Sequence, residues 1–371
     1  VTRVEGHGNI VFNMKENRVE EIRWEVPEAP RFFEAMVKGH SWKEVPLIVS
    51  RICGICSIGH TLTAIKAIEN AFDVQPSEQT IMLRKLALHA ENIQSHVLHV
   101  GYLVAPDLFG VGSVIPLAGS EHKETLLKII RLHRLANNLS DLLAGRTTHP
   151  TSLVVGGFSA IPNYLRLTDM TKDLEEALSL TKEIAAVVKD RALPDFSRET
   201  EYVALSKEGE YALYDGDIKS SDTGVSRDYR EIINEYVVPW STAKYAKHAR
   251  DSYMVGALAR FNINSSFLSK EGRSVADLFG LKAPCYNPFM NTIAQMAELA
   301  HSLEDTLSII NGIRLKNERP VEVKPAKAQA FGACEVPRGL LVHDYSFDEK
   351  GYCTKANMII PTNQNHANIQ K

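Results

Sequence analysis

The sequence predicts an α+β protein that is mostly helical, with a core of bundled long helices and with β-hairpins at the periphery. Several stretches of about twenty residues space their apolar side chains by three and four, as helices do. The first thirty residues and a segment near residue 350 instead alternate apolar and polar side chains around short polar turns, as hairpins do. The 371 residues show no shift in composition that would mark a boundary, so we expect one domain spanning 1–371.

Composition excludes several classes of protein. The chain is 44% hydrophobic and 23% charged with a net charge of −3, which is ordinary for a globular protein and argues against a basic nucleic-acid-binding surface. No apolar run is long enough for a membrane span, and no charged-then-apolar leader opens the sequence. Five cysteines at low density fit a reducing compartment better than a disulfide scaffold. Because residue 1 is Val, we expect the sequence to begin inside a longer gene product.

The expected elements follow in order along the chain. A hairpin is predicted over about 8–28, because Ile10, Phe12 and Met14 alternate before a polar turn at 15–17. A helical core is predicted over about 57–310, with its first helix starting near Ser57. A second, longer helix opens at Pro76 and is stopped by Pro106. Its apolar row steps by three and four through Leu83, Leu86, Ala90, Ile93, Val97, Val100 and Val104.

Further helices complete this core. Ser120 is predicted to cap a third helix that stops at Gly145, and a fourth should run over about 169–190. Residues 196–236 are polar and rich in Gly and Asp, which indicates hairpins or a long excursion. Helical spacing resumes over about 241–267 and again over 291–310.

A second hairpin is predicted over about 338–362, around a D-E-K-G turn near Lys350. If pairing is symmetric about that turn, Arg338 and Thr362 face each other at its open end. Pro337 and Pro361 would then lie beside them, so a cation and a hydroxyl group would meet at one place.

Cys53 and Cys56 stand in R-I-C-G-I-C-S-I-G-H, with His60 four residues further on. Such a turn lets two thiolates reach one metal or each other. We expect Gly54 to relieve crowding in the turn and the following helix N-terminus to lower both thiol pKa values. From the motif alone, a structural zinc half-site, a thiol–disulfide couple and a chance spacing all remain open. The isolated Cys285, Cys334 and Cys353 are expected to be small buried hydrophobes.

Other polar residues are ambiguous when taken singly. Glu5 and Glu34 both have an ordinary interpretation as surface carboxylates. His96 and His99 share a face of the long helix, so hydrogen-bonded core histidines are favoured over metal ligands or proton-transfer groups.

The order of the motifs is far more specific than any one of them. The chain carries, in sequence, T-R-V-E-G-H, P-R-F-F-E, R-I-C-G-I-C-x-x-x-H, S-H-x-x-H-x-x-x-L-x-x-P-D, H-P-x-x-x-x-x-G-G-F, Y-M-V-G-A-L-A-R and V-P-R-G. This order resembles the large subunit of a [NiFe] hydrogenase from residue 2 to about 365. The resemblance implies that family's fold and a Ni–Fe centre with CO and CN ligands on iron.

The resemblance also assigns roles to residues. Cys53 matches a terminal nickel thiolate, and Cys56 matches the thiolate that bridges nickel and iron. His60 matches an imidazole that donates toward the bridging sulfur. Arg338 matches the arginine placed over the open face of the metals, and Thr362 matches a hydroxyl that hydrogen-bonds an iron cyanide. Pro337 and Pro361 flank these two residues in the same expected pocket.

Three more residues follow from the same resemblance. Glu5 matches the proton-relay carboxylate that takes the proton released when H2 is split heterolytically. Glu34 matches a ligand of a nearby Mg2+ ion, with the main-chain carbonyl of about Met358 as a second ligand.

The sequence departs from the family pattern in two ways. The family's second C-x-x-C pair does not occur before Lys371, so we expect the sequence to be truncated. Ser95 stands where some members carry an Asp next to the arginine that Arg338 matches. A metal-free scaffold of the same fold, like the quinone-site subunit of respiratory complex I, is the alternative function. Retention of Cys53 and Cys56 favours the enzyme.

Within the family, the motif details resemble the cytoplasmic, bidirectional group. That group implies an iron–sulfur small subunit, with all Fe–S clusters in partner chains, and further subunits that pass electrons to NAD(P) or a heterodisulfide-type acceptor. H2 is then the substrate.

Overall fold

The computed structural model describes residues 7–27 and 31–371. The main helices are α1 (Phe32–Met36), α2 (Val45–Val49), α3 (Ser57–Phe72), α4 (Glu78–Leu98), α5 (Ala105–Leu108), α6 (Lys123–Ala144), α7 (Tyr164–Val188), α8 (Ala257–Asn264), α9 (Lys270–Leu278), α10 (Asn291–Gly312) and α11 (Pro361–Gln370). A π-helical segment, η1 (His99–Val104), joins α4 to α5, and short 3-10 turns lie at η2 (Ile115–Gly119), η3 (Tyr229–Glu231), η4 (Ser265–Phe267) and η5 (Pro288–Met290).

The strands form small sheets. They are β1 (Asn9–Lys15), β2 (Arg18–Glu25), β3 (Leu153–Val154), β4 (Gly157–Phe158), β5 (Glu201–Ser206), β6 (Asp217–Ser220), β7 (Gly224–Ser226), β8 (Asn234–Tyr236), β9 (Tyr245–Lys247), β10 (Tyr253–Met254), β11 (Ala328–Val336), β12 (Gly339–Phe347) and β13 (Cys353–Ile359). The larger sheets have the orders β10-β5-β6-β7 and β11-β12-β13. The architecture is α+β with a helical majority, which confirms the predicted fold class.

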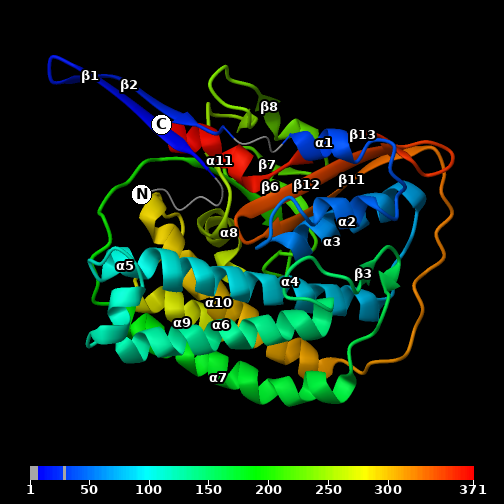
Figure 1. The fold of residues 1–371 in the computed structure, drawn as a ribbon, viewed down its shortest axis with the longest axis horizontal. Coiled ribbons are helices and arrows are strands. Elements are labelled where there is room, and N and C mark those ends of the chain that lie inside the picture. Colours follow the sequence, from blue (N-terminus) through cyan, green and yellow to red (C-terminus); the bar gives the residue numbers. More distant parts are fainter. Residues whose placement is uncertain (1–6, 28–30) are drawn as a thin grey trace.

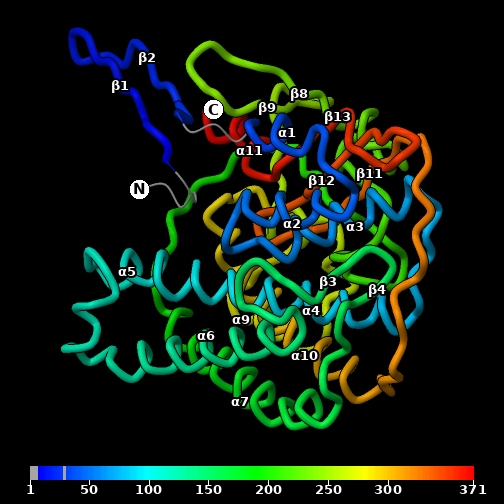
Figure 2. The backbone as a smooth tube through the Cα atoms, turned by 45° about the vertical axis from the view of Figure 1, so that its right-hand side comes forward, coloured from blue at the N-terminus to red at the C-terminus, as the bar shows by residue number. Residues whose placement is uncertain are grey.

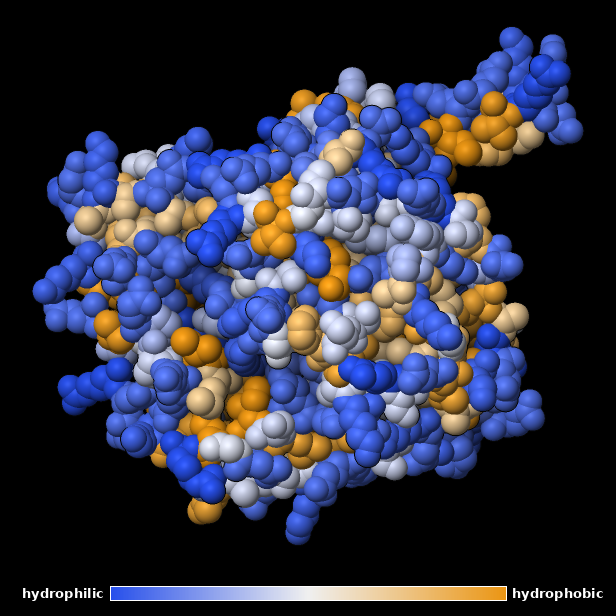
Figure 3. Space-filling model, turned by 180° about the vertical axis from the view of Figure 1, so that it is seen from behind, coloured by the Kyte–Doolittle hydropathy of each residue, from blue (hydrophilic) through white to orange (hydrophobic). Residues whose placement is uncertain are grey.

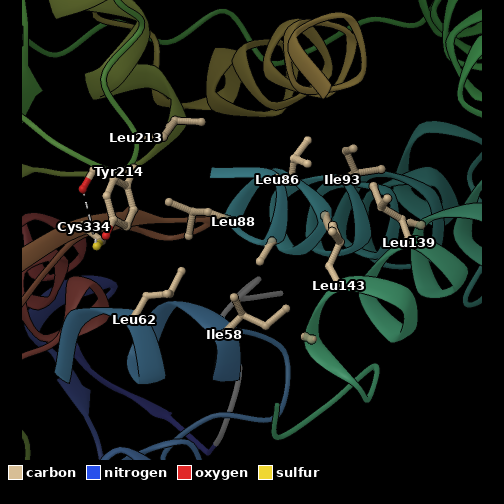
Figure 4. Packing of buried hydrophobic residues seen from close by; sticks show 14 of the residues in the cluster. Ile58, Leu62, Leu86, Leu88, Ile93, Leu139, Leu143, Leu213, Tyr214 and Cys334 are labelled. Carbon is tan, nitrogen blue, oxygen red and sulfur yellow. Dashed lines mark hydrogen bonds between the residues drawn. The ribbon is translucent and has the colours of Figure 1, made fainter. Parts of the chain in front are cut away.

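A bundle of long helices forms one layer of the molecule, in which α4 packs on α6 and α10, and α7 packs on α6 and α10 (Figure 1). The side chain of Ser77 accepts a hydrogen bond from the amide of Thr80 and so caps α4, while Gly145 ends α6 in a left-handed conformation. All seven residues of the predicted apolar row on α4 and its extension are buried. Helix α3 meets this layer through Ile58 and Leu62, which lie in the same apolar cluster as residues of α4 and α6 (Figure 4).

The antiparallel sheet β11-β12-β13 lies against α3, so it belongs to the core and is not a peripheral hairpin. A Cβ atom at Gly332 of β11 would lie 2.5 Å from the amide nitrogen of Ala67 and 2.6 Å from the carbonyl oxygen of Thr63. Only glycine therefore lets this strand approach the backbone of α3 so closely. This packing carries the turn between β11 and β12 to the N-terminal end of α3.

The first hairpin is confirmed, with Phe12 paired to Ile22 and Met14 paired to Val19. It projects from the body of the molecule (Figure 2). Apolar side chains are exposed along it, and they show as orange atoms on the projecting arm in Figure 3. Its base is held to α11 by Trp24, whose Nε1 donates to Nδ1 of His366 at 2.8 Å.

Several predicted boundaries were wrong. The third helix begins at Lys123, because the Ser120 hydroxyl accepts from the amide of His122 in the turn before it. The fourth begins at Tyr164, where Asn163 supplies the cap. Pro106 does not stop the long helix, whose path continues through η1 into α5.

Residues 241–256 are not helical. They contribute β9 and β10, and β10 pairs in parallel with β5. Long-range pairing therefore overrides the local helical spacing there. Strand β11 and helix α11 were not predicted. The sheet excursion over 196–236 was expected and is confirmed. Among the described residues, no helix has the length and apolar character needed to cross a membrane.

Candidate metal centre

Cys53 and Cys56 lie together in the turn that leads into α3. Both side chains are buried, with exposed fractions of 8% and 5%, and the amide nitrogen of Cys56 donates to the sulfur of Cys53 at 3.3 Å. A Cβ atom at Gly54 would meet only one methyl group at 3.7 Å, so the expected relief of crowding by Gly54 is not needed. The hydrogen bond with Cys53 and burial raise the pKa of the Cys56 thiol well above its usual value, so for Cys56 the expected lowering of the pKa was wrong.

Glu91 of α4 contacts the start of α3 directly after this turn, and it was not predicted from the sequence as a residue of the site. Its carboxylate accepts hydrogen bonds from the amides of Ile58 at 2.7 Å and Gly59 at 3.0 Å, which are first-turn amides of α3. These amides have no partner within their own helix, so a buried carboxylate satisfies them. Burial raises the pKa of Glu91 to about 8. Its partners are main-chain groups, and no local sequence signal identifies such a residue.

Arg338 lies in the tight turn between β11 and β12 and reaches the cysteine pair. Its Nη1 is 3.9 Å from the sulfur of Cys56. The turn depends on Gly339, which has φ +130° and whose Cβ would lie 2.6 Å from Cγ2 of Val255 and 2.7 Å from the amide nitrogen of Gly256. The turn therefore packs directly on the loop before α8, and this contact fixes the direction of Arg338.

A fully buried arginine holds this turn from behind. Arg260 of α8 donates to the carbonyl oxygens of Val336 at 2.9 Å and Pro337 at 3.2 Å. Its remaining donors bind Glu298 of α10 at 2.6 and 2.7 Å and Glu335 at 2.9 Å. Although burial opposes ionisation of Glu298, Arg260 holds the pKa of that carboxyl below its usual range, whereas burial raises the pKa of Glu335 to about 7.

His60 begins a buried chain of hydrogen bonds on the other side of the cysteines. Its Nδ1 lies 3.2 Å from Nε2 of His343, and Nδ1 of His343 lies 2.7 Å from the hydroxyl of Tyr345. Burial and the charge of Arg338 lower the pKa of His60 to about 3, and burial lowers the pKa of His343. Both imidazoles are therefore neutral. With the Tyr345 hydroxyl as donor, the chain leaves a proton on Nε2 of His60.

A cavity of about 140 Å³ adjoins Arg338 and Thr362, which confirms that the C-terminal segment brings these two residues together. The pairing of β12 with β13 ends at Ile359, so it does not itself place them face to face. Thr362 instead lies in the first turn of α11, next to the buried Pro361. Pro337 also lines the cavity, as do Ser95 and His99 of the long helical path.

The structure places Glu34 in a separate polar cluster. Its Oε1 accepts from Nζ of Lys244 at 2.8 Å and from the amide of Met358 at 2.9 Å. The same ammonium donates to Glu235 at 3.0 Å and to Asn357 at 2.6 Å. Met358 thus presents its N–H group to Glu34, and not the carbonyl that the resemblance suggested. Lys244 and Glu235 were not predicted.

The structure tests the predictions for His96 and His99 but not the prediction for Glu5. Glu5 lies outside the described residues. His96 and His99 are hydrogen-bonded to Glu298 and Gln295, each at 2.7 Å. This confirms the expectation of a hydrogen-bonded core histidine for His96, which is buried, whereas His99 is only partly buried. Arg260 is the last residue of the quoted Y-M-V-G-A-L-A-R motif, so the motif contained a signal that was left without a role.

The donor set at the turn fits a soft transition metal. Two buried thiols lie three residues apart with the guanidinium of Arg338 next to Cys56, and thiolate ligands suit nickel and iron. Within 7–27 and 31–371, no group of three or more His, Cys, Asp and Glu side chains could hold a metal ion. The described residues therefore offer a soft metal ion two thiol side chains in this turn.

The residues around Glu34 and Met358 fit the predicted Mg2+ ion less well than the cysteine pair fits a soft metal. The carboxylates and the amide around Lys244 are oxygen donors of the kind that Mg2+ prefers. Their common position, however, is taken by the Lys244 ammonium.

Comparison with known proteins agrees with this site. A family model described as nickel-dependent hydrogenase matches residues 31–126. The chain is 31% identical to the alpha chain of sulfhydrogenase 1 from Pyrococcus furiosus, over all of this chain and 88% of that protein. It is 28% identical to a vhu subunit of the F420-non-reducing hydrogenase from Methanocaldococcus jannaschii, over all of this chain and 96% of that protein.

Solved structures show the same fold. A NAD+-reducing [NiFe]-hydrogenase in the H2-reduced state matches with a TM-score of 0.86 and 25% identity, over all of this chain and 89% of that one. A [NiFeSe]-hydrogenase from Dm. baculatum matches with a TM-score of 0.79 and 20% identity, over 98% and 88% of the two chains, and shows the fold alone. The chain belongs to the nickel-dependent hydrogenase family and is the large, catalytic subunit of a [NiFe] hydrogenase.

Proposed function

We propose that Cys53 and Cys56 are ligands of the Ni–Fe centre at which this chain catalyses H2 ⇌ 2H+ + 2e−. The observation that carries this proposal is the burial of both sulfurs in one turn with Nη1 of Arg338 3.9 Å from Cys56. When bound, such a centre supplies the redox capacity and the Lewis acidity for heterolytic cleavage of H2. The complex I-type scaffold has less support, because the thiol pair is retained and buried beside the arginine.

Arg338 has two tasks in this proposal. Its positive charge lowers the pKa of the adjacent Cys56 thiol and so opposes the stronger effects of Cys53 and burial, because opposite charges attract strongly in a site that excludes water. Its rigid turn also holds the guanidinium over one side of the sulfur, so that side admits only small molecules. The cavity beside it, of about 140 Å³, is large enough for a diatomic gas and a few waters.

His60 and Thr362 would orient the surroundings. With His343 and Tyr345 fixing its tautomer, His60 keeps a proton on Nε2 and can donate it toward a thiolate. The hydroxyl of Thr362 lines the cavity with Arg338 and Pro337 and could hydrogen-bond a cyanide ligand of iron, which would also carry CO. Glu5 is the proposed carboxylate that takes the released proton outward.

The Mg2+ ion stays a prediction, with Glu34 and Met358 as its ligands. The oxygens of Glu34, Glu235 and Asn357 support it. The contact of Lys244 with all three does not, so we assign the ion no part in the reaction.

Electrons leave through other chains in this proposal. The cysteines outside the pair stand alone in the sequence, which supports Fe–S clusters held by a partner small subunit. The likeness to a NAD+-reducing enzyme and to F420-non-reducing subunits supports a further module that uses NAD(P) or a heterodisulfide-type acceptor. We propose a cytoplasmic location on the same grounds.

Metal analysis of the complex purified with its partner subunits tests the proposal. We expect nickel and iron together, with infrared bands of CO and CN, in the unaltered protein. Cys53→Ser should lose nickel, whereas the matched change Cys285→Ser, at a cysteine outside the site, should retain it. Zinc alone, or equal nickel content in the two variants, would contradict the assignment.

A further inference from the structure

Helices α4 and α10 run antiparallel and are joined by polar pairs along the line where they touch. Three hydrogen bonds set their register. His99, the first residue of η1 directly after α4, bonds through Nδ1 to Oε1 of Gln295 at 2.7 Å. Within α4, Nε2 of His96 bonds to Oε2 of Glu298 at 2.7 Å, and Nε2 of His89 bonds to Oδ2 of Asp305 at 2.8 Å. The partners advance by equal steps on both helices, so the register is the same at every level. We call this line of contact the α4–α10 seam.

The seam contains buried polar atoms without hydrogen-bond partners among the described residues. In the register set by the three pairs, Asn92 lies level with Ser302, and Thr306 follows one turn further along α10. Six buried polar atoms near the seam lack a hydrogen-bond partner within 7–27 and 31–371. They are Oδ1 and Nδ2 of Asn92, Oγ of Ser302, Oγ1 of Thr306, Nδ1 of His96 and Nδ1 of His89. Each of these residues is at most 4% exposed. Such a row of donors and acceptors indicates a small polar ligand that can do both.

The spacing of the levels fits water. Successive levels on α4 are three or four residues apart, which is about 4.5–6 Å along a helix axis. That distance is too long for a direct hydrogen bond of about 2.7–3.2 Å and matches two hydrogen bonds through one bridging water. Buried waters of this kind bind where two to four polar partners converge.

The two ends of the seam lie in different surroundings. At one end, Ser95, His99 and Gln295 line the cavity that also contains Arg338 and Thr362. At the other end, the side chain of Asp305 is 42% exposed. The polar line therefore connects the cavity beside the proposed metal centre with the surface of the helical layer.

We propose that the α4–α10 seam binds a row of water molecules that carries protons between the cavity beside Arg338 and the surface at Asp305. This inference rests on the proposed function, since it adds a second proton route to the one assigned to Glu5. A proton enters at the cavity water, each water passes one proton to the next, and one proton leaves at the carboxylate of Asp305. No other bond is made or broken.

The charges along the seam permit such a route. Arg260, a buried arginine next to the seam, is compensated by Glu298 and Glu335, so a passing proton meets no net positive charge there. Imidazole, hydroxyl and carboxylate groups border the row, and these groups can accept and release protons.

A high-resolution crystal structure of the holoenzyme tests the water row without reference to activity. We expect ordered waters bonded to the Asn92 amide, to Ser302 Oγ and to Nδ1 of His96. The double variant Asn92→Leu/Ser302→Ala should lose them and keep the positions of α4 and α10. A seam without water in the unaltered protein would overturn the proposal.

Isotope exchange tests the proton route. In the holoenzyme with Glu5→Gln, the residual rate of H2/D+ exchange should fall at least about tenfold when Asn92→Leu/Ser302→Ala is added. Conversion of para-hydrogen to ortho-hydrogen, which needs no proton to leave the site, should persist. Thr181→Val, a buried hydroxyl change on α7, serves as the control and should leave exchange unchanged.

These experiments separate the two proposals. If exchange in the Glu5→Gln background is the same with and without the double change, the seam carries no protons and the inference is wrong. If the unaltered holoenzyme neither binds nickel nor splits H2, the proposed function fails instead, and the crystallographic test of the water row still applies.

Discussion

Nη1 of Arg260 donates to the carbonyl oxygen of Val336 at 2.9 Å, which fixes the main chain two residues before Arg338. The residue that reaches the sulfur of Cys56 is therefore held in place by a second arginine with no exposed surface. A long flexible side chain can be aimed only if its backbone is rigid, and here the rigidity comes from α8 and α10, far from the turn in sequence.

Arg260→Met should strongly destabilise the protein. The change leaves the carboxylates of Glu298 and Glu335 buried without their cation, which costs about 3–5 kcal/mol. Calorimetric unfolding of the complex measures the effect. The control is Arg131→Met, because Arg131 pairs with Glu176 at the surface and such pairs contribute about 0–1 kcal/mol. Equal decreases in the free energy of unfolding of the two variants would show that the buried network contributes no more to stability than a surface ion pair.

Gly339→Ala should distort the turn that carries Arg338. At φ +130° a Cβ atom is strained, and it would also lie within 2.7 Å of the amide nitrogen of Gly256. We expect a loss of about 1–3 kcal/mol in the free energy of unfolding, measured by denaturant titration, together with a lower nickel content. Gly312→Ala has open space around it and should change stability by less than about 0.5 kcal/mol. A fully stable Gly339→Ala variant would contradict this account.

Tyr345→Phe should allow His60 to adopt both of its neutral tautomers. Without the phenol, Nδ1 of His343 has lost the hydroxyl at 2.7 Å, and leaving a buried acceptor unsatisfied costs about 1–3 kcal/mol. Nitrogen-15 spectra of the histidine rings measure the tautomer directly. We expect one tautomer of His60 in the unaltered protein and a mixture in the variant. Identical spectra would mean that the hydrogen-bond chain does not fix His60.

The anchor of the first hairpin should be sensitive to acid. Burial lowers the pKa of His366 to about 4 from its ordinary 6.5, so neutral His366 favours folding above pH 6.5. This contribution falls as the pH drops from 6.5 through 4, because protonated Nδ1 can no longer accept from Trp24. In the folded protein the NMR signal of the Trp24 indole N–H should shift with a midpoint near pH 4. His366→Gln, which cannot titrate there, should abolish the shift, and a shift that survives the change would assign it to another group.

The sequence by itself determined the fold class, most of the helices and the hairpins, because periodicity, caps and turns are local signals. It also determined the cysteine pair, and the order of its motifs determined the family. Helical spacing failed at 241–256, where pairing of β10 with β5 decides the conformation.

Only the tertiary structure decided how the site is held. Glu91, Arg260 and Glu335 act on main-chain amides and carbonyls that lie far away in sequence, and such partners leave no local pattern. The same holds for the α4–α10 seam, whose levels exist only because two helices about two hundred residues apart in sequence pack in one register. Apolar burial brings those helices together, and the polar groups on the shared face must then be satisfied where they meet.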